Sequence, residues 1–479
     1  MIYMAVAGMG PEGLFRDSDT GWHIVTGERI FDTWTLPRVD PYSFTKPGEP
    51  WYAWEWLADV AMGALHKWKG LAGVALGAVV VLAAAAWMWC AFALWLGADA
   101  FIVAALMTLA SFASASHWHA RPHLISWVFL IAWVWLLEQT PSKLSVVRCA
   151  GLFVLMMLWV NLHGSFFLAF FLAGAYGVEF WFRDRRRAST LAVEVIFALV
   201  ATFCNPYGSQ LHAHLARYLT NTEMLAFIRE FQSLNFHGFG GIISIALFLL
   251  AISGAGLCFQ QGHLARGLVI LMLSAIALRS ARGIPLVAFV ALPLSTAAIT
   301  RALTAWKPIE VLLSESNAFR NIERQATGAL FLLLAAGGLF FWYSTGTASA
   351  RARFPAERLP VQAAEALDRL DPSTRLFAPD YFGGYIIYRF SGKRKVFFDG
   401  RSDFYGTQFV KDYVNTMAME PGWRKKFGRF QFTHALLPED HALREALECL
   451  GWQRLYGDST AVLLEHPKAA PAHEVCSLP

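Results

Sequence analysis

Two carboxylates near the start of the chain have a spacing that suits chemistry. Asp17 and Asp19 flank Ser18, and Trp22 and His23 follow. In an extended segment, residues two apart point to the same side, so both carboxylates would address one point. They would serve there as a general base or as ligands of a divalent cation. A solvated loop is the alternative, but the membrane-surface helix expected just after this segment favours a site.

A second cluster of chemically active side chains lies at the expected end of an apolar run, in the sequence HWHARPH. It contains His117, His119, Arg121 and His123. Ionisable residues at a membrane surface are costly, which favours a function. Side chains that reach from the helix end to the membrane surface are the alternative. A metal site is suggested only weakly, because the HxH pair has no clear acidic partner.

A third polar group, Asn161 and His163, interrupts an otherwise apolar stretch within the sequence NLHG. A polar break at membrane depth is tolerated where it lines a cavity. We therefore expect these two residues to line one, together with His23, His119 and Glu55. A simple turn between two helices is the alternative.

Arg279 and Arg282 form a fourth group, which is expected on the side of the membrane where positive charge is depleted. Such a pair needs an anion. A phosphate fits the guanidinium fork, and ion pairing with an acid such as Glu230 is nearly as favoured. In the later segment DGRSD, which contains Asp399, Arg401 and Asp403, an internal Arg–Asp pair that fixes a turn is the preferred interpretation.

The elements that hold these residues are mostly membrane helices. Of 479 residues, 56% are hydrophobic and only 16% are charged, and the mean hydropathy is +0.41. Soluble proteins usually carry about 25% charged residues, so the composition indicates a polytopic α-helical membrane protein. A net charge of +5 without a basic stripe gives no indication of a nucleic-acid partner. No phosphate-binding loop or dinucleotide fingerprint occurs, so no nucleotide cofactor is expected.

The chain is expected to have three parts. Residues 1–70 form a first loop that includes an amphipathic, Trp-rich helix at 51–68 lying in the membrane interface. Residues 71–344 form a bundle of about ten transmembrane helices, and residues 352–479 form a soluble α/β domain. The apolar runs lie at 71–95, 99–115, 124–138, 146–160, 164–182, 190–204, 240–258, 264–279, 284–300 and 326–344.

The basic loops predict an orientation. The segment RDRRR at 183–187 is expected to be cytoplasmic, and the loops assigned to the same side carry most of the Lys and Arg. Residues 1–70, the other polar clusters and the domain at 352–479 then all face outward. We expect a multi-pass protein of a bacterial inner membrane whose C-terminal domain is extracytoplasmic.

This combination of features resembles the GT-C superfamily of membrane glycosyltransferases, near the ArnT-like and protein-mannosyltransferase-like enzymes. The shared features are an acidic DxD loop, an interfacial helix, about ten further spans and an outward α/β domain. The stretches that resemble an uncharacterised bacterial branch are DSDTGWHIVTGERI, LPRVDPYSFT, WEWLADV, ARPHLIS, NLHGSF, NPYG and FFDGRSDFYG. The resemblance also implies a transmembrane helix ahead of the DxD loop, whereas only fifteen residues precede Arg16 here.

The resemblance implies roles for particular residues. Asp17 or Asp19 would act as base toward an acceptor or help to hold a divalent cation. Arg121, Arg279 and Arg282 would bind the phosphate of a polyprenyl-phosphate sugar, and the acceptor would be a glycan, a lipid or a protein. The alternatives are a transporter or flippase for a lipid-linked saccharide, and a membrane assembly protein without catalysis. Polar residues near one surface favour chemistry over transport.

Overall fold

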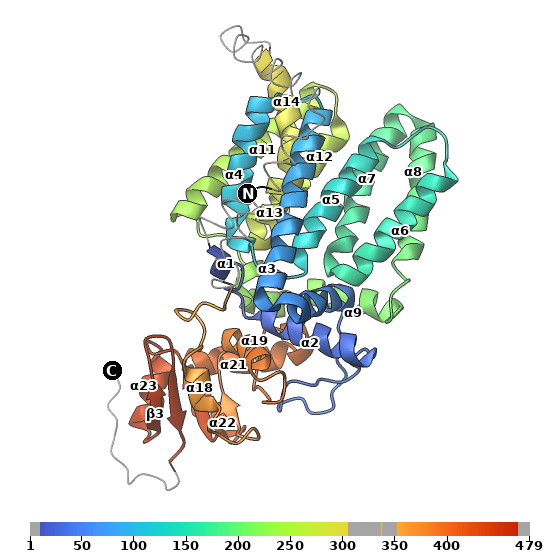
Figure 1. The fold of residues 1–479 in the computed structure, drawn as a ribbon. Coiled ribbons are helices and arrows are strands. Elements are labelled where there is room, and N and C mark those ends of the chain that lie inside the picture. Colours follow the sequence, from blue (N-terminus) through green and yellow to red (C-terminus); the bar gives the residue numbers. More distant parts are fainter. Residues whose placement is uncertain (1–9, 305–336, 338–351, 468–479) are drawn as a thin grey trace.

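The computed structural model describes residues 10–304, 337 and 352–467, and it is mainly helical (Figure 1). The expected run at 326–344 lies outside the described residues apart from residue 337. The first part of the chain contains α1 (Gly10–Gly13), α2 (Asp19–Thr33), α3 (Trp56–Trp95), α4 (Ala100–Ser114), α5 (His123–Glu138), α6 (Val146–Leu162), α7 (Leu168–Arg183), α8 (Arg185–Ala201), α9 (Ser209–Thr220), α10 (Thr222–Phe227), α11 (Phe239–Gln260), α12 (Leu264–Arg279), α13 (Ile284–Leu286) and α14 (Leu292–Thr304).

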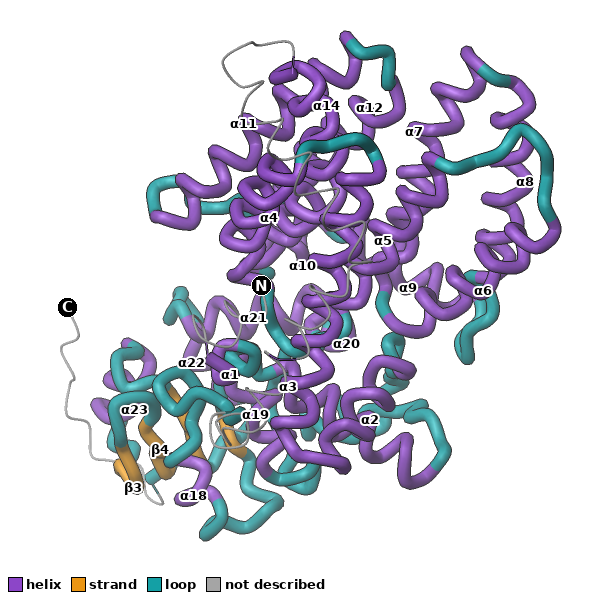
Figure 2. Tube along the Cα trace, turned by 45° about the horizontal axis from the view of Figure 1, so that its top comes forward, coloured by secondary structure: helices purple, strands orange, loops and turns teal. Residues whose placement is uncertain are grey.

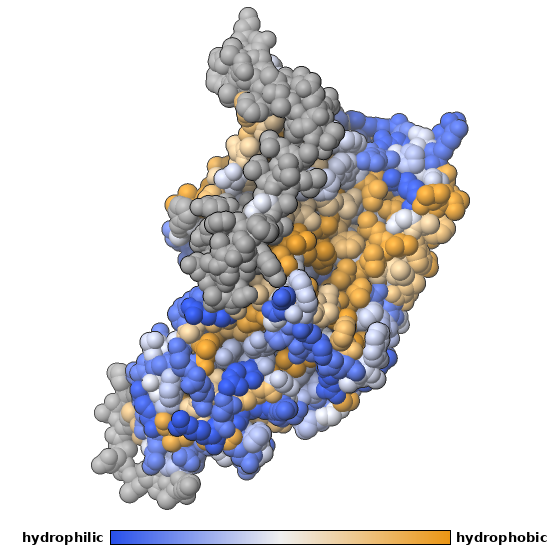
Figure 3. Space-filling model, viewed as in Figure 1, coloured by the Kyte–Doolittle hydropathy of each residue, from blue (hydrophilic) through white to orange (hydrophobic). Residues whose placement is uncertain are grey.

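The bundle consists of helices that suit a lipid environment, because a helix satisfies its own backbone polar groups. In the described part of the chain, five helices are long and apolar enough to cross a membrane: Trp56–Trp95, Ala100–His117, Gly164–Arg183, Gly240–Gln260 and Ala281–Thr304. His123–Glu138 and Val146–Leu162 are shorter apolar helices. Figure 3 shows hydrophobic side chains exposed over this region. The chain is thus a membrane protein by fold and composition, while the number of spans and the orientation stay predictions.

Helix α3 is broken where the sequence predicts the change from an interfacial helix to a span. Lys69 and Gly70 have non-helical backbone angles, and Gly70 has a positive φ of 59°. Glycine adopts this conformation without the penalty that a side chain would add. The helix around Glu55 and Asp59 is therefore a separate segment from the apolar span that follows Gly70.

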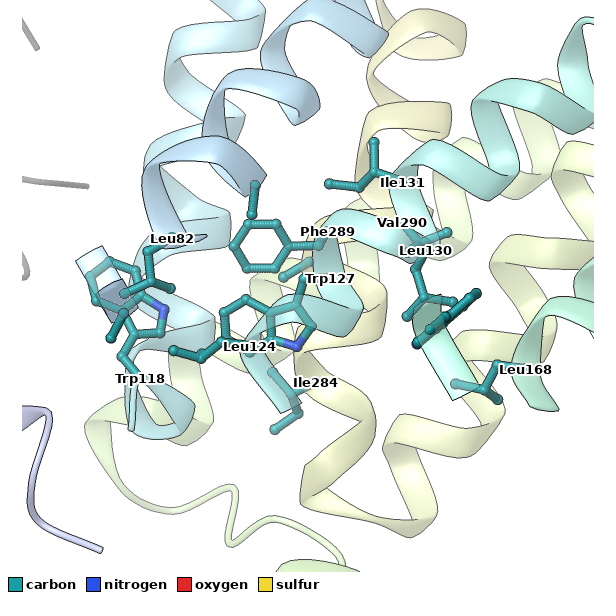
Figure 4. Packing of buried hydrophobic residues seen from close by; sticks show 14 of the residues in the cluster. Leu82, Trp118, Leu124, Trp127, Leu130, Ile131, Leu168, Ile284, Phe289 and Val290 are labelled. Carbon is teal, nitrogen blue, oxygen red and sulfur yellow. The ribbon is translucent and has the colours of Figure 1, made fainter. Parts of the chain in front are cut away.

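The core of the bundle is packed with aromatic and branched side chains (Figure 4). Trp127 of α5 stacks on Phe289 with ring centroids 4.7 Å apart, and both are buried. Phe289 lies in a π-helical turn at Val287–Ala291 that interrupts the helix between α13 and α14. The indole N–H of Trp89 donates to the carbonyl of Ala288 in this turn (2.8 Å). This packing fixes the helix ends that carry the polar clusters.

The tail forms a small domain of helices around a short sheet (Figure 2). Its sheet has the order β1-β2-β4-β3, with β1 parallel to β2 and the other pairs antiparallel. Its elements are α18 (Ala363–Leu367), β1 (Leu376–Phe377), α19 (Asp380–Arg389), α20 (Ser402–Tyr405), α21 (Thr407–Met417), α22 (Trp423–Gly428), β2 (His434–Leu437), α23 (Ala442–Cys449), β3 (Gln453–Gly457) and β4 (Val462–Glu465).

The tail domain and the first loop are held together by one buried ion cluster. Arg401 makes a bidentate pair with Asp399, with both N···O distances 2.7 Å, and its third nitrogen lies 2.8 Å from Asp40. The hydroxyl of Tyr405 donates to Asp399 (2.8 Å). All four side chains are buried. The expected internal Arg–Asp pair is present: its acid is Asp399, and a further partner, Asp40, comes from the first loop.

Candidate functional site

The expected cluster residues meet where the ends of the membrane helices face the tail domain. Helix α2, which the sequence did not predict, packs along the start of α3 and against α19. The helices touch through their backbones, because a Cβ on Gly27 would lie 1.7 Å from the carbonyl oxygen of Asp59. This contact brings the segment before α2 and the start of α3 into one place.

Asp17 and Asp19 share one cationic partner, Arg121 of the HWHARPH loop. Arg121 Nη1 lies 2.5 Å from Asp17 Oδ2, and Nη2 lies 3.2 Å from Asp19 Oδ2. The expected extended segment is wrong, because Ser18 has helical angles and Asp19 is the first residue of α2. The carboxylates converge because one guanidinium reaches both, since its fork offers several donors in one plane.

The two aspartates differ in their electrostatics. Burial raises the pKa of Asp19 to about 7, and the neighbouring Asp17 raises it further against the opposing charge of Arg121. Burial also acts to raise the pKa of Asp17, but Arg121 and His119 outweigh it and lower that pKa. Asp17 is therefore the ionised partner of Arg121, and Asp19 is the aspartate of the pair that takes up a proton more readily.

Glu230 joins Arg121 to Arg282. Glu230 Oε2 lies 2.5 Å from Arg282 Nη2, and Oε1 lies 3.6 Å from Arg121 Nη1. Burial acts to raise the pKa of Glu230, but Arg282 and Arg121 outweigh it, so that the pKa falls well below its usual range. Arg279, which the sequence grouped with these arginines, is exposed and makes no ion pair within the described residues.

Glu55 lies between two histidines that come from distant parts of the chain. Its Oε1 is 3.4 Å from His163 Nε2, and its Oε2 is 3.9 Å from His23 Nε2. His23 Nδ1 bonds the carboxylate of Asp59 at 2.6 Å, and both of those side chains are buried. The predicted cavity residues His23, Glu55 and His163 thus lie together, and Asp59 joins them.

The other two predicted cavity residues have different surroundings. The side chain of Asn161 accepts a hydrogen bond from the Trp56 indole (2.7 Å) and donates to the carbonyl of Cys204 (2.9 Å). Asn161 thereby holds Trp56, the residue that follows Glu55. His119 Nδ1 is buried and has no hydrogen-bond partner within the described part of the chain. Its charge acts on the pKa of Asp17, which places it near the Asp pair.

The expected divalent cation does not fit these residues as they are arranged. Arg121 holds both aspartates, so a cation there would compete with a guanidinium for the same oxygens. Within the described residues, no three His, Cys, Asp or Glu side chains come together in a way that could hold a metal ion. We therefore derive no step through a metal.

Asp59 was not assigned to the site from the sequence, although a usable signal for it was present. Asp59 lies four residues after Glu55, the spacing that places two side chains on one face of a helix. Acidic residues on an apolar helix are costly, so this pair was detectable. In contrast, the backbone of Gly400 covers Asp19: a Cβ on Gly400 would lie 1.9 Å from Asp19 Oδ1. No local pattern reports that contact between parts of the chain so far apart.

Comparison with known proteins supports the fold. No family model and no curated protein sequence matches the chain. The chain is similar to the Archaeoglobus fulgidus oligosaccharyltransferase in its apo form, with a TM-score of 0.51 and 12% identity over 95% of this chain and 71% of that one. The same protein tethered to an acceptor peptide containing the NVT sequon gives a TM-score of 0.53 and 11% identity, over 88% of this chain and 65% of that one. The predicted fold is confirmed: the chain has a GT-C fold.

Proposed function

We propose that this chain with a GT-C fold is a glycosyltransferase that moves a sugar from a polyprenyl-phosphate donor to an acceptor outside the cytoplasm. One observation carries the proposal: Arg121 and Arg282 converge on a single carboxylate, Glu230, next to the ends of membrane helices. Two guanidinium groups around one anion suit a phosphate, whose oxygens match their forks. A donor whose phosphate lay there could keep its polyprenyl chain in the membrane.

The reaction needs charge stabilisation at the donor phosphate. As the bond between the anomeric carbon and the phosphate oxygen breaks, negative charge grows on the polyprenyl phosphate. Fixed cations in a water-poor site stabilise that charge better than water does. Asp17 and Asp19 contribute by holding Arg121 in place. That one of them also acts as the base stays a prediction from the sequence.

The arginine geometry gives a first prediction. Arg282→Lys is expected to weaken binding of a polyprenyl monophosphate about tenfold, because a point charge replaces a bidentate fork. Arg279→Lys is the matched control, since Arg279 is exposed and makes no ion pair in the described part of the chain. Binding to the full-length protein in nanodiscs measures the effect. Equal affinities for wild type and Arg282→Lys would remove Arg282 from the phosphate site.

Glu230 gives a second prediction. Its carboxylate occupies the space between the arginines, so a phosphate must displace it or share its partners. Glu230→Gln removes the competing charge but keeps a similar shape. We expect polyprenyl monophosphate to bind several-fold more tightly, up to about tenfold for roughly 1.4 kcal/mol. Weaker binding in the Glu230→Gln variant would mean that the acid supports the ligand instead of competing with it.

A further inference from the structure

Within the described residues, Glu55 is a partly exposed carboxylate of the candidate site that no arginine contacts; Asp59 has no arginine partner either, but it is buried against His23. The side chains of Asp17 and Asp19 contact Arg121, and Glu230 contacts Arg282. The oxygens of Glu55 instead face two imidazoles, and 23% of its side chain is exposed. A base must reach its substrate and must not be neutralised by a permanent partner. Glu55 meets both conditions.

The hydrogen bonds of His163 fix which of its nitrogens carries a proton. Its Nδ1 accepts the backbone N–H of Ser165 (3.2 Å), so this nitrogen provides a lone pair. The proton of the neutral ring then lies on Nε2, which points to Glu55 Oε1. The backbone of Gly164 also acts to lower the pKa of Glu55, which favours the ionised carboxylate. One side of the carboxylate therefore faces a donor.

His23 faces the other oxygen of Glu55, Oε2, with a hydrogen-bond acceptor. Its Nδ1 lies 2.6 Å from Asp59 Oδ1; an ionised Asp59 accepts the ring N–H there, which leaves the lone pair on Nε2. This lone pair lies 3.9 Å from Glu55 Oε2. Trp22 stacks on the ring with centroids 3.6 Å apart and limits its rotation. A proton on Oε2 would thus find an acceptor, which a proton on Oε1 would not.

We infer that Glu55 is the base that takes the proton of the acceptor hydroxyl, and that His23, oriented by Asp59, is a positioning residue that stabilises the protonated carboxyl. The inference rests on the proposed function and assigns one step of it. Asp17 and Asp19 are then left with the task of holding Arg121.

The step balances as an ordinary substitution at the anomeric carbon. The acceptor O–H bond breaks and its proton moves to Glu55 Oε2, while the acceptor oxygen forms a bond to the anomeric carbon. The bond between that carbon and the phosphate oxygen breaks, and its electron pair leaves with the polyprenyl phosphate. The new O–H of Glu55 donates to His23 Nε2. The proton passes to water after the products leave.

The electrostatics support a base that works near neutral pH. Burial raises the pKa of Glu55 to about 7, and Arg121 and Arg282 oppose that rise, whereas Asp403 adds to it. The other ionisable groups that face Glu55 are His23, His163 and Asp59. Only the ionised carboxylate of Glu55 can act as a base. The turnover rate should therefore be at its maximum above about pH 7 and should fall as the pH drops through that value.

The experiment compares two glutamates that each lie beside a histidine. Native membrane vesicles carrying each full-length variant are given a panel of polyprenyl-phosphate pentoses and hexoses, and release of polyprenyl phosphate is followed from pH 5 to 9. Glu55→Gln should lower the release rate by about 10²–10⁴-fold. Glu28→Gln is the control, because Glu28 pairs with a different histidine: its Oε1 lies 2.7 Å from His66 Nδ1. The release rate of this variant should stay unchanged.

Two further variants separate the assignment from its rival. His23→Asn should lower kcat about tenfold with KM unchanged and should move the pH midpoint downward, because protonated Glu55 loses its acceptor. Asp19→Asn should impair binding of polyprenyl monophosphate more than the chemical step. Two results would overturn the assignment of Glu55 as the base and leave the proposed function standing. One is a Glu55→Gln variant with the release rate of wild type. The other is an Asp19→Asn variant that binds donor normally but does not turn it over. If wild-type vesicles consume no donor of the panel, the proposed function fails and the assignment fails with it.

Discussion

Replacing Arg121 by alanine is expected to reduce sugar transfer by at least about 100-fold, the largest effect of any single change outside the base. The substitution removes a cation from the donor phosphate and leaves Asp17 and Asp19 without their shared partner. Turnover of a polyprenyl-phosphate sugar in vesicles and binding of polyprenyl monophosphate should both fall.

A double-mutant cycle distinguishes the two causes of that loss. If Arg121 also stabilises the aspartates, adding Asp17→Asn to Arg121→Ala should restore thermal stability, because it removes an unpaired carboxylate. It should not restore transfer, since the cation at the phosphate is still missing. Recovery of transfer in the double variant would show that Arg121 serves only to neutralise Asp17.

Replacing Arg401 by methionine is expected to destabilise the contact between the tail domain and the first loop by about 3–5 kcal/mol. The change leaves Asp399 and Asp40 buried without a cation. Thermal unfolding in detergent and protease sensitivity of the tail domain would both report it. The matched control is Arg389→Met, because the pair of Arg389 with Asp368 is exposed, and such pairs contribute about 0–1 kcal/mol.

A combined substitution checks the cause of that destabilisation. Replacing Asp40, Asp399 and Arg401 together by apolar residues of similar size should recover much of the lost stability, since no buried charge is then left unpaired. Equal instability of the single and triple variants would instead mean that the geometry of the pairs specifies the docked arrangement.

The apolar runs expected between residues 71 and 300 lie in helices, because lipid imposes long apolar runs on any spanning helix. Five helices of the described residues are long and apolar enough to cross a membrane, so the bundle of about ten spans stays a prediction. The tail was harder to predict. The segment GYIIYRF has the β-branched and aromatic composition of a strand, yet it lies in α19, where contacts with α2 override that composition. β2 and β4 lie in the apolar runs THALLP and AVLLEH, whereas the similar run KVFFD makes an isolated bridge between Ser43 and Val396.

Which residues cluster in the candidate site was predictable in part, whereas their pairings were not. Polar residues in apolar surroundings identified Arg121 and His163, because burying such groups is costly unless they serve a purpose. The spacing of Glu55 and Asp59 was also readable. The contact of Arg121 with Asp17, 104 residues apart, and that of Glu230 with Arg282 depend on tertiary structure alone. A single sequence reports no long-range pairing. The convergence of Asp17 and Asp19 was therefore attributed to an extended segment, whereas their shared partner Arg121 brings it about.

Lipid analysis of a deletion strain shows whether the chain consumes a polyprenyl-phosphate sugar. The strain is complemented with wild type, Arg121→Ala or Glu28→Gln, and membrane lipids are quantified by mass spectrometry. We expect one polyprenyl-phosphate sugar to accumulate in the deletion strain and with Arg121→Ala, and to fall with wild type and Glu28→Gln. A pool of polyprenyl-phosphate sugars that is identical in all four strains would contradict the account.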